Sequence, residues 1–235
     1  MPQISDHILQ SSNTEYQRLT NETLKMGEMA ASQLQAALDV VERRDTNAAE
    51  RLIMNDEAID QLEAIISHDV MQLALRGPMA RDLREILATI RIASDIERIG
   101  DYAANLAKRS TVLNAVTPVP HVSSLRNLGR LVVEQFRMAL DSYRTNDTEL
   151  ALRVRDNDKN IDAAYTSLFR DLLTYMMEDP RNITPCTHLQ FMAKNLERAG
   201  DHATNIAENV WFREKSEHPL PPREKDDSAN TTAAP

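Results

Sequence analysis

The strongest constraint on the fold of this 235-residue chain is that one sequence pattern occurs in it twice. The segment Glu97-Arg-Ile-Gly-Asp-Tyr-Ala-Ala-Asn returns, with the numbering shifted by 100, as Glu197-Arg-Ala-Gly-Asp-His-Ala-Thr-Asn. Earlier in each half, Asp56 returns as Asp158 with a shift of 102. A shared bias toward helix formers would not repeat Gly, Asn and Asp at fixed positions. The chain is therefore a duplicated unit whose halves share one fold.

Each half is expected to form three long helices. No proline falls between residues 3 and 77 or between 121 and 179, and apolar residues recur there at helical spacing. A polar turn at 44–47 divides the first stretch into two helices, and a third is expected from about 81 to 109. The inward face of that third helix is predicted to carry Leu83, Leu87, Ile90 and Ala93.

The expected fold class is all-α, with two tandem pseudo-symmetric antiparallel three-helix bundles and six long helices. Aromatic residues make up only 4% of the chain, and short alternating apolar runs typical of strands are missing from the sequence. The predicted boundaries are an N-terminal extension (1–12), a first bundle (13–110), a proline-stiffened linker (111–122), a second bundle (123–213) and a polar, disordered tail (214–235).

Composition indicates the cellular compartment and excludes one class of partner. The net charge of −9 argues against nucleic acid as a partner, because neutralising phosphates needs a basic surface. A single cysteine, Cys186, excludes an internal disulfide and favours the reducing cytoplasm. We expect neither a signal peptide nor a spanning helix, so any association with a membrane would pass through partner proteins.

Paired carboxylates are the candidate functional residues. Glu97 and Asp101 are spaced i and i+4 beside the predicted apolar stripe of the third helix, so they are neighbours on one helical face. Like charges there repel and partial burial adds a desolvation cost, so a cation, an arginine or water must compensate. The second helix carries the same spacing at Asp56 and Asp60. The equivalent residues of the second half are Asp158, Asp162, Glu197 and Asp201.

Hard oxygen ligands of this kind suit iron, manganese, magnesium or calcium better than zinc. The competing interpretation is structural pairing with Arg98 and Arg198. A ferritin-like di-iron site is excluded, because none of the six histidines follows a Glu-x-x-His pattern. Asp69 and Asp171 also recur, and the only role we expect for them is a salt bridge.

The two segments Asp95-Ile-Glu-Arg-Ile-Gly-Asp-Tyr-Ala-Ala-Asn and Asn195-Leu-Glu-Arg-Ala-Gly-Asp-His-Ala-Thr-Asn resemble the duplicated signature of the PhoU family. The resemblance covers roughly residues 10–213. It implies two symmetric three-helix bundles that bind metal ions, as iron clusters or as manganese, magnesium or zinc. Carried over by position, the metal ligands would be Asp56, Asp60, Glu97, Asp101, Asp158, Asp162, Glu197 and Asp201, with Asn105 and Asn205 orienting them.

The resemblance also implies a role: negative regulation of the phosphate-starvation response. The partners it implies are the ATPase subunit of a phosphate ABC transporter and a sensor histidine kinase, with a homodimer as the assembly. The sequence departs from the pattern at Asn195, the position equivalent to Asp95 in the first copy. This difference would give the second site one negative charge fewer.

Two other functions compete with a non-enzymatic cytoplasmic adaptor. Clustered carboxylates that hold two metals can activate water, so a metal-dependent phosphohydrolase is the first alternative. The sequence offers it no histidine ligand and no candidate general acid near the pairs. A purely structural bundle is the second alternative, and it leaves the repeated acid pairs unexplained.

Overall fold

A computed structural model of the chain describes residues 3–77, 80–215 and 220, of which 3–13 and 80–81 are described by their backbone alone. Within these residues the chain is helical and contains no strand. The elements are α1 (Gln3–Arg43), α2 (Thr46–Asn55), α3 (Glu57–Ala74), α4 (Ala80–Asn114), α5 (Val122–Thr145), α6 (Thr148–Glu178), the 3₁₀ turn η1 (Pro180–Asn182) and α7 (Ile183–Glu214).

The prediction of six long helices in two equivalent sets of three is confirmed. Helices α1 and α4 of the first repeat correspond to α5 and α7 of the second, and α2 with α3 corresponds to the single helix α6. The separation of α2 from α3 falls at one residue, Asp56, whose backbone stays in the right-handed helical region. Helices α2 and α3 thus form one nearly continuous helix, which is interrupted locally at Asp56, one of the candidate site residues.

The first turn of each repeat is built in the same way. Arg44 and Asn146 lie 102 positions apart and both have a left-handed backbone, with φ of 56° and 57°. The next residue in each repeat caps the following helix: Asp45 accepts a hydrogen bond from the amide of Ala48, and Asp147 accepts from the amides that follow it. The polar turn expected at 44–47 is confirmed.

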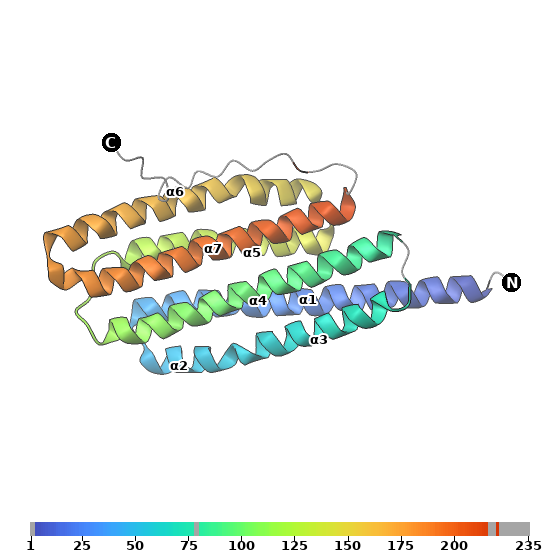
Figure 1. Cartoon of the computed structure of the whole chain (residues 1–235), viewed down its shortest axis with the longest axis horizontal. Coiled ribbons are helices and arrows are strands. Elements are labelled where there is room, and N and C mark those ends of the chain that lie inside the picture. The colour runs from blue at the N-terminus through green and yellow to red at the C-terminus, as the bar shows by residue number, and fades with distance from the viewer. Residues whose placement is uncertain (1–2, 78–79, 216–219, 221–235) are drawn as a thin grey trace.

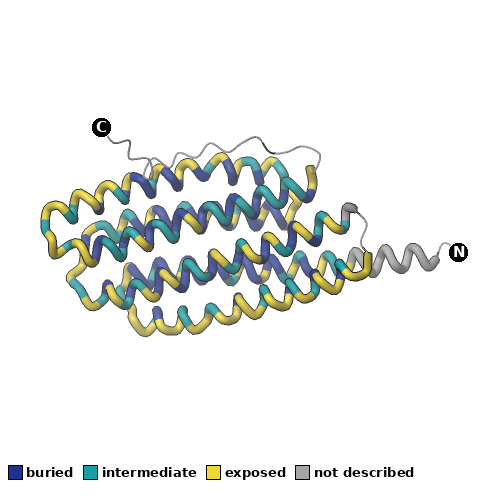
Figure 2. The backbone as a smooth tube through the Cα atoms, viewed as in Figure 1, coloured by how far each residue is buried: buried dark blue, intermediate teal, exposed yellow. Residues whose placement is uncertain are grey.

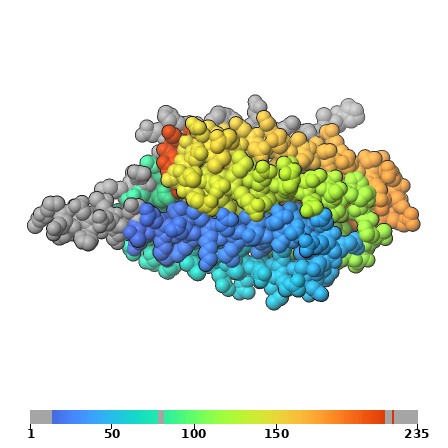
Figure 3. Space-filling model, turned by 180° about the vertical axis from the view of Figure 1, so that it is seen from behind, coloured from blue at the N-terminus to red at the C-terminus, as the bar shows by residue number. Residues whose placement is uncertain are grey.

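The two bundles lie side by side (Figure 1). Helices α4 and α7 pack against each other on one face of the molecule, and α1 and α5 pack against each other on the opposite face, which Figure 3 shows from behind. The pair α2–α3 covers one outer edge and α6 the other. Four central helices therefore join the repeats, and each repeat's second helix lies away from the other bundle.

Two reciprocal contacts fit α1 to α5. A Cβ atom at Gly27 of α1 would collide with Leu140 of α5, and a Cβ atom at Gly129 of α5 would collide with Leu38 of α1. The two glycines are 102 positions apart, and so are the two leucines. The contacts therefore exchange under the pseudo-two-fold axis, as expected for duplicated helices that pack against each other.

Half of the predicted core stripe of α4 was wrong. Ala93 is buried and Ile90 packs against the core as predicted, but Leu83 and Leu87 are 43% and 38% exposed, and Ile86 and Ile92 are buried instead. The true inward stripe of α4 is rotated, because α4 packs on α1 and α3 on one side and on α7 on the other. The central helices are consequently buried over more of their circumference than the outer pair α2–α3 (Figure 2).

The connection between the bundles is shorter than the predicted linker, because α4 continues to Asn114 and α5 begins at Val122. Most of the tail predicted to be disordered lies outside the described residues. Within the described part of the chain, no helix is long and apolar enough to cross a membrane.

Candidate functional site

A buried glutamine ties the three helices of each repeat together at the candidate acids. In the first repeat, the amide of Gln33 on α1 donates to Asp56 Oδ1 at 2.7 Å and lies 3.4 Å from the carbonyl oxygen of Gly100 on α4. In the second repeat, Gln135 donates to Asp158 Oδ1 at 3.0 Å and to the carbonyl of Gly200 at 3.2 Å. The first acid of each site is therefore held in one orientation by the same construction.

The glycines of the repeated signature allow this close approach. A Cβ at Gly100 would lie 3.1 Å from Ile59 Cδ1 and 3.5 Å from Asp56 Oδ1. A Cβ at Gly200 would lie 3.0 Å from Ile161 Cδ1. The second helix of each repeat thus packs directly on the glycine of the third, which places the acids of the two helices side by side.

The four acids of the first repeat lie close enough to perturb one another. Burial raises the pKa of Asp56 above its ordinary value, and the charges of Asp60 and Asp101 raise that pKa further against the lowering effect of the Gln33 hydrogen bond. Burial and then Asp101 raise the pKa of Glu97, and Arg98 opposes them. Desolvation and Asp101 also raise the pKa of Asp60, although this residue is exposed.

The expected pairing with Arg98 is present but weak. Its Nε lies 3.3 Å from Glu97 and its Nη1 lies 3.1 Å from Asp101, and its side chain is 54% exposed. Exposed ion pairs contribute about 0–1 kcal/mol, because water screens them. After burial, the charge of Asp101 raises the pKa of Glu97 by more than Arg98 lowers it, so this arginine does not offset the negative charge around Glu97.

The acids of the second repeat are more deeply buried than those of the first. Asp158, Asp162 and Glu197 are all buried, with relative exposures of 3%, 5% and 5%. Lys194, whose side chain is 28% exposed, lies one turn earlier on α7, and its Nζ lies 2.8 Å from Glu197 Oε1. The second cluster therefore has a positive charge in contact with one of its buried acids.

The structure places the predicted ligands on the intended helices without forming a closed metal site. Among the described residues, no group of three or more His, Cys, Asp or Glu side chains is arranged to hold a metal ion. The oxygen donors of the first repeat fit a hard cation in type, and Asp60 and Asp101 are accessible enough to turn toward one. The second repeat does not fit in the same way, because Lys194 lies against Glu197.

The two asparagines predicted to orient metal ligands have other surroundings. Asn105 is exposed. Asn205 on α7 lies 3.4 Å from the carboxylate of Asp95 on α4, across the interface between the bundles. The same carboxylate oxygen of Asp95 lies 2.8 Å from Nδ1 of His202. Asp95 thus joins the two repeats and belongs to their interface. The presence of Asn195 at the equivalent position of the second repeat therefore does not account for a difference between the two acid clusters.

The Asp95–His202 contact does not follow from spacing within one helix, because the two residues lie in different repeats. The phenol of Tyr102, the residue equivalent to His202, lies 3.5 Å from its Nε2. The signal available in the sequence was the coupled difference between the repeats, with Asp and Tyr in the first segment and Asn and His in the second. The salt bridge expected for Asp69 is confirmed, with Arg18 at 2.6 Å.

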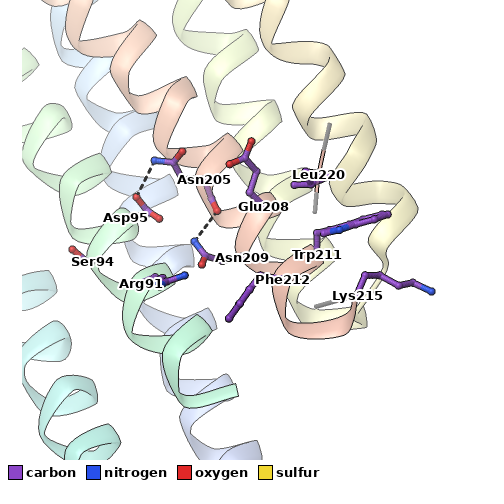
Figure 4. Close-up of a pocket in the computed structure, with 10 residues that line it drawn as sticks. All are labelled: Arg91, Ser94, Asp95, Asn205, Glu208, Asn209, Trp211, Phe212, Lys215 and Leu220. Carbon is purple, nitrogen blue, oxygen red and sulfur yellow. Dashed lines mark hydrogen bonds between the residues drawn. The ribbon is translucent and has the colours of Figure 1, made fainter. Parts of the chain in front are cut away.

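A hollow of about 510 Å³ opens beside this interface, between α4 and α7 (Figure 4). Asn205 and Asp95 lie at one end, and Trp211 and Lys215 at the other. The guanidinium of Arg91 lies 5.3 Å from the ring centre of Phe212 at its rim. The hollow has an aromatic wall and charges of both signs.

The same architecture is found in known proteins. A family model described as the PhoU domain matches residues 23–110 and 125–210. A "Phosphate-specific transport system accessory protein PhoU homolog" of Xylella fastidiosa (strain 9a5c) is 65% identical over 224 residues, which are 95% of either chain. The protein of the same name from Rhizobium meliloti (strain 1021) is 44% identical over 96% of either chain.

Solved structures agree with the sequence comparison. PhoU from Pseudomonas aeruginosa superimposes with a TM-score of 0.84 at 34% identity, over 87% of this chain and 99% of the other. The phosphate transport system regulatory protein PhoU from Streptococcus pneumoniae gives 0.82 at 26% identity, over 87% and 97%. Because both the family model and close relatives match almost the whole of both bundles, the chain belongs to the PhoU family.

Proposed function

We propose that this chain is a cytoplasmic regulatory adaptor that keeps phosphate-starvation genes off while phosphate is plentiful. It does so by linking a phosphate ABC transporter to a sensor histidine kinase. The observation that carries the proposal is the 65% identity, over 95% of both chains, to a protein named as an accessory of phosphate-specific transport. The action is one of protein contacts, so catalysis is not required.

Exposed apolar side chains at equivalent positions of the two bundles support an adaptor role. Met71 and Leu75 near the end of α3 are 57% and 75% exposed, and their equivalents Leu173 and Met177 on α6 are 41% and 86% exposed. Large apolar side chains repeated on two surfaces are the kind of feature that partner proteins cover. Duplication has preserved these positions at both far ends of the molecule, where the second helix turns into the third.

The metal proposal rests on the first repeat. Asp56, Asp60, Glu97 and Asp101 would hold a hard cation such as manganese, iron or magnesium through carboxylate oxygens. Burial, and after it the charges of neighbouring acids, raise the pKa of three of these acids, and the cation would offset the repulsion among them. Metal binding would then stabilise the bundle that carries one of the two exposed ends.

The decisive experiment is deletion of the gene in its own host, with a phosphate-starvation reporter measured in phosphate-rich medium. We expect the reporter to switch on and the wild-type chain to switch it off again. An unchanged reporter in the deletion strain would contradict the regulatory role. Release of phosphate from a phosphomonoester by the manganese-loaded protein would favour the phosphohydrolase alternative instead.

Matched variants test the surface. Leu75→Glu and Met177→Glu place a charge on each exposed apolar end, and we expect either to fail to restore repression while keeping the wild-type melting temperature. The control is Met54→Asp, because Met54 is 75% exposed and its equivalent in the second repeat is Asp156. Restored repression by all three would show that these ends do not contact a partner.

A further inference from the structure

Two neighbouring positions differ between the repeats in a coupled way. Ser94 of α4 corresponds to Lys194 of α7 with the shift of 100, and Glu63 of α3 corresponds to Tyr165 of α6 with the shift of 102. Lys194 contacts Glu197 of the second acid cluster, and Glu63 lies close enough to the first cluster to raise the pKa of Glu97 and Asp60. The first repeat therefore carries an extra acid there, whereas the second carries a cation and a neutral ring.

The second-repeat pair forms one contact. The Lys194 ammonium lies 2.8 Å from Glu197 Oε1 and 5.2 Å from the centre of the Tyr165 ring. The Glu197 side chain is only 6% exposed. An ammonium between a buried carboxylate and an aromatic face is stabilised by both, and a carboxylate at position 165 could not supply the neutral face.

The first-repeat pair has the opposite character. The Glu63 carboxylate raises the pKa of Glu97 and of Asp60, and Glu63 accepts a hydrogen bond from Ser67 at 2.7 Å. Ser94 is exposed and brings no charge. The first cluster contains five acids, whereas the second contains four acids and a lysine. The two sequence differences together therefore make the second cluster more positive by two charges.

We propose that Lys194 is the built-in cation of the second acid cluster, so that metal binding by this chain is confined to the first. This inference rests on the metal sites of the proposed function and departs from the symmetric pair of metal sites that the family resemblance implies. A divalent ion entering the second cluster would have to displace the ammonium from Glu197 and remain beside its charge. The second cluster therefore carries a counter-charge of its own beside Glu197, and the first is the cluster whose stability responds to metal.

The test counts manganese ions and assigns them to a repeat. Metal-stripped full-length protein is titrated with Mn²⁺ while free Mn²⁺ is followed by electron paramagnetic resonance. We expect the double substitution Glu97→Gln/Asp101→Asn to abolish binding, and Glu197→Gln/Asp201→Asn to leave it in place.

The substitutions Ser94→Lys and Lys194→Ser test the proposal more directly than the changes to the acid pairs. We expect Ser94→Lys to weaken Mn²⁺ binding by about tenfold or more, because it adds a positive charge to the first cluster. Lys194→Ser should lower the melting temperature of the metal-free protein, and saturating Mn²⁺ should raise it by more than in the wild type. If the Lys194→Ser protein does not fold without metal, the Mn²⁺ affinity of the Ser94→Lys protein still tests the proposal, because this substitution leaves the second bundle intact.

Equal Mn²⁺ occupancy of the two repeats in the wild type would overturn the inference, and so would unchanged affinity in Ser94→Lys. Mn²⁺ binding by no variant would overturn it as well. None of these outcomes touches the regulatory role, which reporter expression in the deletion strain tests separately.

Discussion

Nδ1 of His202 on α7 lies 2.8 Å from a carboxylate oxygen of Asp95 on α4, and this contact joins the two bundles. Since a carboxylate only accepts, the imidazole carries its hydrogen on Nδ1, which leaves Nε2 facing the hydroxyl of Tyr102 at 3.5 Å. Both side chains are mostly buried, with 23% and 14% exposure. The contact is therefore shielded from water enough to contribute to stability.

The first prediction concerns this contact. Asp95→Asn removes the charge from the acceptor, and we expect the free energy of unfolding to fall by about 1–2 kcal/mol. Urea denaturation followed by circular dichroism measures it. Asp171→Asn, at an exposed position, serves as the control and should change stability by less than about 0.5 kcal/mol. Equal stability of wild type and Asp95→Asn would show that the contact contributes nothing.

Most of the fold could be predicted from the sequence because duplication, proline positions and helical periodicity all indicate the same helices. The Asp45 and Asp147 caps mark the first turn in each repeat, and their spacing follows the repeat offset. The orientation of α4 could not be predicted, because a helix that packs on neighbours at two sides has no single apolar stripe. That is why Leu83 and Leu87 were wrongly placed inward.

The candidate site was only partly predictable. Identical spacing correctly indicated equivalent positions for the acids, and the glutamines that hold Asp56 and Asp158 occupy equivalent positions too. Spacing could not show that the second cluster is buried next to Lys194 while the first is accessible. Contacts between bundles, such as those of Asp95, depend on how the repeats pack, which the period within one helix does not record.

The second prediction concerns the signature glycines. Alanine has a higher helix propensity than glycine by about 1 kcal/mol, so Gly200→Ala would stabilise an isolated helix. In the folded protein its Cβ would lie 3.0 Å from Cδ1 and 3.2 Å from Cγ2 of Ile161, so the buried Ile161 side chain would have to shift. We expect a net loss of about 1–2 kcal/mol, measured by urea denaturation. A companion Ser94→Ala variant, exposed on α4, should be neutral; a stabilised Gly200→Ala protein would contradict the tight fit.

The third prediction concerns the first turn. One terminal nitrogen of Arg44 lies 2.9 Å and 3.0 Å from the carbonyl oxygens of Leu113 and Asn114 at the end of α4, and 2.6 Å from that of Val116 just beyond it. Arg44→Ala removes these contacts and keeps a non-glycine residue at a left-handed φ of 56°. We expect a loss of about 2 kcal/mol, measured by thermal and urea denaturation. Exposed Arg43→Ala is the matched control, and equal effects of the two would argue against a specific role.

The last prediction uses the direction of the pKa shifts in the first acid cluster. Burial and neighbouring acids raise the pKa values of Asp56, Asp60 and Glu97 above their ordinary values of 3.8, 3.8 and 4.5. A raised carboxyl pKa means that the folded state holds its proton more tightly than the unfolded state. Its stabilising effect is complete below the ordinary value and is lost as pH rises through the folded value.

Metal-free protein should therefore lose stability as pH rises above these ordinary values, and Glu97→Gln/Asp101→Asn should lose less. If Arg98 dominated the cluster, the pKa of Glu97 would be lowered and stability would rise over the same range, so the two interpretations predict opposite slopes. Saturating Mn²⁺ at neutral pH should raise the melting temperature of the wild type and raise it less in the double variant. Exposed Glu50→Gln serves as the control and should follow the wild type in every curve. A double variant that is less stable than the wild type at every pH, with the same response to Mn²⁺, would show that these acids are structural partners of arginine.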